Sequence, residues 1–527
     1  MDTKALRQKI LDLAIRGKLV PQDPNDEPAS VLLERIREQK KQMLKEGKLK
    51  AKDVKNDTII FVGEDNLHYE KFQDGTVKCI EDEIPFEVPE GWCWTRLGSL
   101  FSTITGSTPS TKDSSLYGDE YPFYKPTDLD AGFDVHFSED TVSEKGYNSG
   151  RILPVYSVLV TCIGATIGKT GYIRNSGICN QQINAILPNT FILPEYTYFC
   201  MCSEFEQQQI WTNSSATTLP ILNKSKFDSL FFPVPPKAQQ IRTVERIKEL
   251  LHFVEIIQQE KITLQEKIKL TKSKIIDLAI RGKLVPQDPN DEPASMLLER
   301  IRAEKEELIK QGKIKRNKKE SFIFRGDDNS YYQNNGNETI DISDELPFDI
   351  PVSWCWGKLK DIVIINPRNK LEDDKEVAFV PMTLIEDAYS GNHTFEIRKW
   401  KDIKNGFTHF MEGDVGVAKI TPCFENRKSV IFKNLCNGYG AGTTELHILR
   451  PYKNTILPEY LLAYIKTNQF IENGKQTFSG AVGQQRIGKE YIETIYFPIP
   501  PLQEQHRIIK HINDVFTYLN IMEDALS

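Results

Sequence analysis

Apolar positions near the end of the chain recur with the spacing of a coiled-coil helix. They step by 4, 3, 4, 3 and 4 residues, at Ile508, Ile512, Val515, Leu519, Met522 and Leu526. This alternation places one apolar stripe along a helix and is typical of a heptad seam. A helical period also runs through residues 237–280. At about 1.5 Å per residue, one continuous helix over that stretch would be roughly 65 Å long.

Shorter helical patterns open the chain. Leu6, Ile10 and Leu13 predict a short amphipathic helix over residues 1–15, and the glycine at position 17 is typical of a helix stop. A turn-rich loop follows. Pro28 then occupies a favoured first helical position. We therefore predict a second, charged helix that runs to about residue 46.

Two stretches with mixed patterns lie between these helical parts, at residues 92–233 and 354–498. Short runs of β-branched and aromatic residues, such as residues 155–160, alternate with Gly, Asn and Ser turns. A helical stretch is expected near residues 195–211. These stretches predict two globular α/β modules.

The chain contains two nearly identical copies of one long stretch, residues 10–37 and 275–302. Of the 28 aligned positions only two differ, Leu11 against Ile276 and Val31 against Met296. The offset of 265 persists further on, where the motif FFPVPP at 231–236 aligns with YFPIPP at 496–501. A repeat of this length sets the architecture of a chain. Because the second copy ends about where the first runs into the next repeat, we expect the two termini to meet within one helical rod.

Together these patterns predict an α+β fold: two α/β modules joined by a long antiparallel coiled coil, with an internal pseudo-twofold repeat. The connectors are almost identical and the module interiors differ, which indicates two modules that do one kind of job on different targets. The predicted parts are an N-terminal helical region (1–50), the first module with the linker before it (51–235), a central helical region (236–320), the second module with its linker (321–500), and a C-terminal helix that pairs with the N-terminal one (501–527).

Composition and charge narrow the class of protein. With 39% hydrophobic residues the chain can bury sizeable cores. A net charge of −7 argues against a uniformly basic nucleic-acid binder, although it allows a local basic groove. Nine cysteines without CxxC pairs argue against a disulfide framework or a zinc ribbon. The sequence has no signal region and no stretch long enough to cross a membrane, so we expect a cytoplasmic protein that does not contact membranes.

Most catalytic motifs are missing. Residues 164–170, GATIGKT, resemble a phosphate loop, but they have one residue too few between the glycines and no helix start after them. The run EDDK at 372–375 is better explained as a charged surface turn than as a nuclease cluster. There is no dinucleotide fingerprint, no amino-methyltransferase motif, no HExxH and no GxSxG, and the eight histidines show no ligand spacing. We therefore predict no catalytic residue, no metal site and no cofactor in this chain.

What remains is polar loop chemistry suited to reading DNA base edges. Residues 419–428, KITPCFENRK, carry three cations, an Asn and an aromatic residue on a loop that contains proline. Residues 479–487, SGAVGQQRI, place two glutamines and an arginine after flexible glycines. Glutamine can pair bidentately with adenine, and arginine with guanine. The corresponding first-module stretches are 163–174 and 214–224; for each loop, an ordinary surface turn is the alternative.

These loops, and positions that follow short apolar runs, supply the candidate DNA-binding residues. In the first module they are Lys125, Thr127, Lys169, Arg174, Thr217, Thr218 and Lys224. In the second module they are Thr383, Lys419, Thr421, Asn426, Arg427, Lys428, Gln484, Gln485 and Arg486.

The ordered combination of these motifs resembles the specificity subunit of type I restriction–modification systems. The motifs are the duplicated LAIRGKLVPQ connector, the IPFEVPEGW-like segment at the start of each module, the FPVPP and FPIPP exits, and the KITPCFEN and SGAVGQQRI loops. The resemblance covers essentially the whole chain. It implies two target-recognition domains, each reading one half of a split DNA sequence, with a helical rod that sets the number of unread base pairs between the halves.

The resemblance also implies partners. These are double-stranded DNA, two copies of a modification subunit that binds S-adenosylmethionine and methylates adenine, and a restriction subunit that uses ATP and Mg for cleavage and translocation. The chain itself would be non-catalytic and would hold none of these cofactors. Two alternatives stay open: a nucleotide hydrolase that uses residues 164–170, and a coiled-coil scaffold whose modules bind protein.

Overall fold

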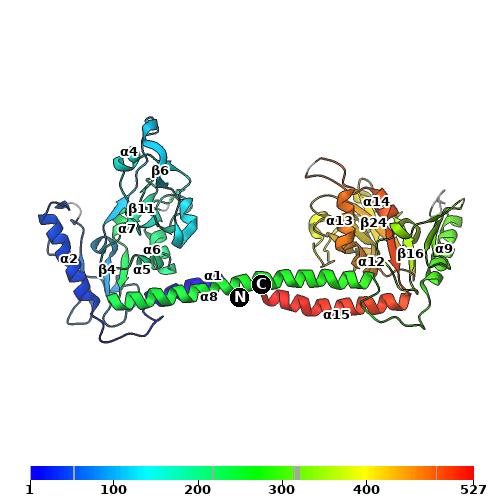
Figure 1. Cartoon of the computed structure of the whole chain (residues 1–527), viewed down its shortest axis with the longest axis horizontal. Coiled ribbons are helices and arrows are strands. Elements are labelled where there is room, and N and C mark those ends of the chain that lie inside the picture. The colour runs from blue at the N-terminus through cyan, green and yellow to red at the C-terminus, as the bar shows by residue number, and fades with distance from the viewer. Residues whose placement is uncertain are drawn as a thin grey trace. The chain divides into compact units, whose positions relative to one another are not determined.

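The computed structural model describes residues 2–51, 54–215, 219–312, 314, 321–336, 338–481 and 483–526. It divides into two compact units, Met1–Glu260 (unit 1) and Lys261–Ser527 (unit 2). Each unit contains, in the same chain order, a helix and connector, a three-stranded hairpin sheet and a mixed module. The repeat seen in the sequence is therefore a repeat of structure (Figure 1).

Long helices frame both units. The predicted helix over residues 237–280 is confirmed as α8, Lys237–Ile280, which contributes to unit 1 up to Glu260 and to unit 2 from Lys261. The other helices of the frame are α1 (Thr3–Ile15), α2 (Ala29–Lys45), α9 (Ala294–Lys310) and α15 (Leu502–Leu526). The short N-terminal helix, the charged helix and the C-terminal helix predicted from the sequence are thus all present.

In unit 1, α1 packs against the first part of α8. Ile10, Leu11 and Ile15 share one buried cluster with Val244 and Ile247 of α8. The Arg7 guanidinium lies 3.6 Å from the Glu255 carboxylate. Arg242, near the start of α8, pairs with Asp26 in the connector that follows α1. Rising numbers along α1 thus meet falling numbers along α8, so the two helices are antiparallel.

In unit 2, α15 lies along the last part of α8, and these two helices are again antiparallel (Figure 1). The Lys272 ammonium lies 2.5 Å from the Glu523 carboxylate, and Arg507 pairs at 2.6 Å with Asp291. The predicted seam is only partly buried, because Ile508 and Ile512 are buried whereas Met522 is 46% exposed. Ile508 and Ile512 pack into the buried core cluster of unit 2, whereas Met522 lies outside that cluster, which explains this difference.

The mixed module of unit 1 is built from small sheets. Their strand orders are β1-β2-β3, β10-β6-β7, β5-β11-β8-β9 and β12-β4. The strands are β1 (Ile59–Val62), β2 (His68–Lys71), β3 (Val77–Cys79), β4 (Cys93–Arg96), β5 (Thr103–Thr105), β6 (Tyr117–Tyr124), β7 (Thr141–Val142), β8 (Val158–Thr161), β9 (Thr170–Tyr172), β10 (Ile178–Cys179), β11 (Ile183–Ile186) and β12 (Phe231–Val234). The short helices are η2 (Glu81–Glu83), α3 (Leu97–Leu100), η3 (Ser114–Leu116), η4 (Asp128–Asp134), α4 (Glu144–Ser149), α5 (Pro194–Met201), α6 (Glu204–Asn213) and α7 (Lys224–Asp228).

Unit 2 repeats this plan with one larger sheet. Its strand orders are β13-β14-β15, β16-β25, β17-β24-β21-β22 and β19-β18-β23-β20. The strands are β13 (Phe322–Arg325), β14 (Tyr331–Asn334), β15 (Thr339–Asp341), β16 (Cys355–Lys358), β17 (Val363–Ile365), β18 (Glu376–Val380), β19 (Glu396–Lys399), β20 (Thr408–Met411), β21 (Val415–Ala418), β22 (Ser429–Ile431), β23 (Tyr439–Gly442), β24 (Leu446–Pro451) and β25 (Tyr496–Ile499). The short helices are η5 (Ser343–Glu345), α10 (Leu359–Ile362), η6 (Met382–Leu384), α11 (Trp400–Ile403), η7 (Cys436–Gly438), α12 (Pro458–Ile465), α13 (Asn468–Gln476) and α14 (Lys489–Thr494).

The helical stretch predicted near residues 195–211 is present as two helices, because α5 ends at Met201 and Ser203 caps a new helix, α6, by accepting a hydrogen bond from the Glu206 N–H. One local prediction needs correction. The strand expected at residues 155–160 begins only at Val158, since Tyr156 has a φ of +70°. A positive φ is incompatible with regular strand geometry.

The same polar contacts fasten the module to the helical frame in both units. In unit 1 the Trp92 indole N–H lies 3.1 Å from Gln22 Oε1 and 3.0 Å from Gln239 Oε1. In unit 2 the Trp354 indole donates to the Glu504 carboxylate at 2.9 Å. These buried contacts tie the connector, the start of the module and the start of the long helix together at equivalent places.

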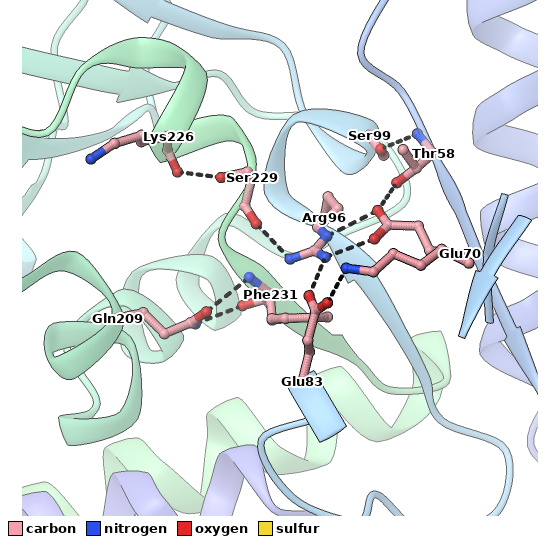
Figure 2. A network of polar contacts seen from close by, with 10 residues as sticks. Thr58, Glu70, Glu83, Arg96, Ser99, Gln209, Lys226, Ser229 and Phe231 are labelled. Atoms are coloured by element: carbon pink, nitrogen blue, oxygen red, sulfur yellow. Dashed lines mark hydrogen bonds and ion pairs between the residues drawn. The ribbon is translucent and has the colours of Figure 1, made fainter. Parts of the chain in front are cut away.

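The hairpin sheet of unit 1 is held to its module by a buried ion pair (Figure 2). The Arg96 guanidinium donates to both oxygens of Glu70, at 3.0 and 2.7 Å, and lies over the Phe231 ring at 3.7 Å. The Thr58 hydroxyl donates to the same carboxylate at 2.6 Å. Because Glu70 is almost completely buried, its charge depends on these donors.

Among the described residues, no helix is both long enough and apolar enough to span a membrane.

Candidate nucleic-acid interface

The two loops singled out in the second module meet in space. The Thr421 N–H donates to the Gln485 carbonyl at 2.9 Å, and the Ile487 N–H donates to the Lys419 carbonyl at 2.9 Å. Ile420 and Arg486 form an antiparallel bridge between them. We call residues 419–421 and 485–487 the loop junction of unit 2. It joins the loop between β21 and β22 to the loop that precedes α14.

Unit 1 contains the same junction, formed by residues 162–164 and 220–222. The Gly164 N–H donates to the Pro220 carbonyl at 3.0 Å, and the Leu222 N–H donates to the Cys162 carbonyl at 2.8 Å. Ile163 bridges Ile221 in antiparallel fashion. The loops again lie between two paired strands, β8 and β9, and before a short helix, α7. Backbone bonds thus build one loop arrangement twice, although the sequences of the loops differ.

Charge at the unit 2 junction comes from Lys419 and Arg486. Arg486 donates to both oxygens of Glu445, at 2.8 and 2.9 Å, and this guanidinium lowers the pKa of the Glu445 carboxyl. Lys419 makes no ion pair with any residue that the structure describes. Gln484 is exposed and Gln485 half-buried at the same edge. Lys419 and the two amides are therefore the junction's side chains best suited to contact a ligand.

Residues 426–428, at the end of the β21–β22 loop away from the junction, form hydrogen bonds with other parts of unit 2. Arg427 donates to the Lys466 carbonyl at 3.0 Å and to Asn468. Lys428 donates to the Ile385 carbonyl at 3.0 Å. Asn426 is exposed and accepts a backbone hydrogen bond from the Ala388 N–H. Arg427 and Lys428 thus have structural partners, and their contact with DNA stays a prediction.

A buried lysine supports this loop from below. The Lys466 ammonium donates to the Ala388 carbonyl at 2.6 Å and to the Arg427 carbonyl at 3.3 Å. Burial lowers the pKa of Lys466 to about 7, and the neighbouring Arg427 also lowers it. Ala388 and Arg427 both have positive φ, of 51° and 56°. Lys466 therefore fixes two unusual backbone turns next to the candidate loop.

The first-module candidates gather around η4. Lys169 pairs with Asp130 at 2.6 Å and Arg174 with Asp134 at 2.8 Å. Lys125 pairs with Asp140, which follows η4 in the chain. Thr127 is exposed at the N-cap of the same helix. The three cationic side chains thus lie around one helix, but each of them forms an ion pair with a carboxylate.

The second module has a matching cluster at η6. Thr383 is exposed on η6, and Lys428 reaches the carbonyls of Met382 and Ile385 at its two ends. Strand pairing places Lys169 and Lys428 at equivalent positions, one residue before the strands that start at Thr170 and Ser429. The two lysines therefore occupy one place in the repeated fold, and each is engaged by partners within its own unit.

Of the three remaining candidates, the structure describes Lys224. Lys224 is the first residue of α7 and pairs with Asp228 at 2.5 Å. Thr217 and Thr218 lie outside the described residues. No observation tests which of these side chains contacts DNA, so the whole candidate set stays a prediction.

The phosphate-loop alternative for residues 164–170 does not fit the fold. The segment connects β8 to β9, which are antiparallel neighbours in one sheet, with Val160 opposite Thr170. A phosphate loop leads from a strand into a helix, whose N-terminal N–H groups bind the phosphates. Here a strand follows, and Lys169 pairs with Asp130. The geometry therefore lacks the helix on which that chemistry depends.

Sequence reasoning missed Arg368, His409 and Glu445. Arg368 follows β17 in a polar turn and has no motif around it, while His409 lies on β20 and Glu445 just before β24. Only the sheet order brings them near Lys419 and Arg486.

Comparison with known proteins agrees with this doubled geometry. The model of the family described as Type I restriction modification DNA specificity domain matches the chain twice, over residues 89–266 and 351–526. Together the two matches make up more than half of the chain. The chain belongs to this family. The resemblance noted from the sequence is thereby confirmed, as is an α+β fold with an internal repeat.

Relatives within the specificity-domain family include two Escherichia coli proteins. The Type I restriction enzyme EcoAI specificity subunit is 46% identical over 257 residues, which is 49% of this chain and 41% of that protein. The EcoEI specificity subunit is 46% identical over 243 residues, which is 46% of this chain and 38% of that protein. The matched part of the chain thus spans less than half the length of these two relatives.

A solved structure has the specificity-domain fold of this chain. It is a chain from work on complex assembly and conformational transition of the type I R-M system, with a TM-score of 0.54 and 16% sequence identity. The alignment covers 84% of this chain and 94% of that one. At this level of identity the likeness concerns the fold.

Proposed function

We propose that the chain is the DNA-specificity subunit of a type I restriction–modification complex. Each unit reads one half of a bipartite double-stranded target. The long helix and its partner helices set the number of unread base pairs between the halves. Cationic side chains position each module by contacting phosphates of the DNA backbone, and loop side chains specify the bases. The chain directs adenine methylation and restriction without catalysing either reaction.

The observation that carries this proposal is the loop junction. The same backbone hydrogen bonds build it in both units, yet its side chains are Lys419, Gln485 and Arg486 in unit 2 and Cys162, Pro220 and Ile221 at the matching places in unit 1. One frame that carries two different sets of side chains is what two readers of different half-sites require, although the Cys162 side chain itself is buried. A correct bidentate contact supplies about 1–3 kcal/mol of discrimination between bases.

Because the proposal assigns no reaction to this chain, it includes partner subunits that catalyse methylation and cleavage. Two copies of a modification subunit bind S-adenosylmethionine and methylate adenine. A restriction subunit uses ATP and Mg for translocation and cleavage. The assembly works in the cytoplasm, without membrane contact. The two similar units support a complex with two modification subunits, which native mass spectrometry of the purified assembly would count.

An exchange of modules tests the proposal. Residues 354–498 are replaced by a second copy of residues 92–233, and the variant is expressed with its partner subunits. We expect the methylated target to contain two copies of the half-site that unit 1 reads, with the spacing between halves retained. Methylation sequencing of the host genome measures both features at once.

The reciprocal exchange is the control, and it should yield two copies of the other half-site. Alteration of both half-sites in a single exchange would contradict modular reading. If the full chain with its partners bound no duplex DNA even at low salt, the protein-binding scaffold would be the better explanation.

A further inference from the structure

A polar pocket lies beside the loop junction of unit 2. It has a volume of about 170 Å³ and is lined by Arg368, Lys419, Thr408, Thr444, His409 and His447, with three further residues. Pockets that enclose a whole small-molecule ligand are larger, at about 300–1,000 Å³. The pocket is therefore suited to small polar groups rather than to a whole small-molecule ligand.

The lining carries positive charge without a carboxylate. Arg368 is exposed, and Lys419 has no ion-pair partner among the described residues. The nearest acid at the junction, Glu445, is neutralised by two hydrogen bonds from Arg486. The Thr408 and Thr444 hydroxyls can each donate a hydrogen bond to an anion or accept one from a cation. A concave surface lined by one sign of charge concentrates its field toward the pocket, which favours an anion.

His409 holds Arg368 in place. Its Nδ1 accepts the Asn369 N–H at 3.2 Å, and its Nε2 lies 2.9 Å from the Lys404 carbonyl. These partners assign the proton to Nε2 and fix the turn that carries Arg368. The guanidinium donates to the Phe407 carbonyl at 3.1 Å through one nitrogen. A guanidinium has five N–H donors, so others remain to bind a ligand.

We propose that this pocket binds one or two phosphate groups of the DNA backbone through Arg368 and Lys419, and thereby sets the register of the unit 2 loops on the duplex. The inference rests on the proposed function and adds a site to it. Arginine, lysine and threonine side chains supply many of the phosphate contacts that position proteins on DNA. Because Lys419 belongs to the loop junction, a phosphate held here lies next to Gln484 and Gln485.

Unit 1 lacks this charge at the matching places. Cys162 occupies the position of Lys419 in the junction, and Asn184 stands opposite Val160 as His447 stands opposite Val417. Neither residue is cationic. Unit 1 thus has no counterpart of the Lys419 charge at the junction, and removing the charges of Arg368 and Lys419 should weaken the hold of unit 2.

The salt dependence of DNA affinity tests the proposal. Fluorescence anisotropy of the full chain with a random-sequence duplex gives log K against log salt, whose slope falls by about 0.9 for each phosphate that the protein no longer neutralises. We expect Arg368→Ala with Lys419→Met to reduce the slope by about 1–2. Between about 50 and about 200 mM salt, a reduction of that size changes the ratio of the two affinities by about 4-fold to about 16-fold.

The control removes the same net charge elsewhere. Lys433 and Lys475 pair with Glu459 and Glu472, outside the pocket. The double variant Lys433→Met, Lys475→Met should keep the wild-type slope. Arg368→Lys should retain most of the slope that Arg368→Ala loses, because it restores the charge. Melting temperatures of all variants show whether each is folded.

Each outcome decides. An unchanged slope in a folded Arg368→Ala, Lys419→Met variant would overturn the pocket. An equal loss in the control pair would also overturn it, because net charge would then explain the effect. Stabilisation of the wild type by inorganic phosphate alone, with an unchanged DNA slope, would mark a free-anion site and overturn the DNA contact. If the wild type shows no salt-dependent DNA affinity at all, the proposed function itself fails.

Discussion

One pair of residues shows how the two units differ under a common backbone. Glu70 of β2 and Arg96 of β4 form a buried ion pair in unit 1 (Figure 2). The matching positions in unit 2 are Gln333 of β14 and Lys358 of β16. Lys358 lies 5.1 Å above the Tyr496 ring, as Arg96 lies above Phe231. The cation and ring remain in unit 2, but the buried carboxylate is absent.

This difference predicts that acid loosens the hairpin of unit 1 more than the hairpin of unit 2. Burial alone would raise the pKa of the Glu70 carboxyl, but hydrogen bonds from Arg96 and Thr58 outweigh it, and the net pKa is lowered. A lowered folded-state pKa stabilises the fold fully above the unfolded value of about 4.3, and this contribution is lost as the pH falls through the folded value. We expect β2 to lose more hydrogen-exchange protection than β14 below about pH 4.

A substitution makes the two hairpins alike. Glu70→Gln copies the residue found at position 333, so β2 should then respond to pH as β14 does. Protection factors corrected for intrinsic exchange are the measurement. Equal acid loss in the two wild-type hairpins would contradict this assignment of the pH response.

At the scale of elements, α15 shows where a coiled-coil seam stabilises the protein. Ile508 is completely buried with the core of unit 2, whereas Met522 on the same seam is 46% exposed. We expect Ile508→Ala to cost roughly 2–5 kcal/mol of unfolding free energy, because it leaves a cavity. Met522→Ala should stay within about 0.5 kcal/mol. Urea unfolding, monitored by hydrogen exchange in α15, measures the loss of unfolding free energy for both variants. Similar losses for the two would contradict a seam that is buried only at one end.

Elements whose periodic pattern extends over many residues were predictable, and short elements were less so. The bounds of α8 could be read from the sequence because the helical period extends over 44 residues. The break between α5 and α6 was missed, although Ser203 and Glu206 have the spacing of a capping box, which is the signal for a new helix. Tyr156 shortened a predicted strand through a positive φ that no neighbouring glycine announces.

The candidate site was predictable as separate loops but not as one surface. Composition identified residues 419–428 and 479–487, yet the bond from Thr421 to Gln485 joins positions far apart in the chain. Pairings of that range depend on sheet order, for which these loops carry no local signal. For the same reason Arg368 and Glu445 were absent from the predicted set, and the partners of Arg427 and Lys428 could not be foreseen.

At the scale of the whole molecule, α8 is the one helix, among the residues described, that contributes to both units. If it sets the spacer, seven residues inserted after Glu260 keep the heptad phase and add about 10.5 Å. We expect the methylated target to gain about three unread base pairs, at about 3.4 Å each, with both half-sites unchanged. Methylation sequencing of a host that carries the variant measures this. Changed half-sites with the old spacer would contradict the role of α8.

The loop junction also has an evolutionary consequence. The main-chain bonds are the same in both units, although the residue type differs at every matched position that makes them: Cys162 against Lys419, Gly164 against Thr421, Pro220 against Gln485 and Leu222 against Ile487. A frame held by main-chain groups tolerates exchange of its side chains. If the junction reads DNA as proposed, lineages can therefore acquire new sequence preferences by point mutation here while the architecture persists.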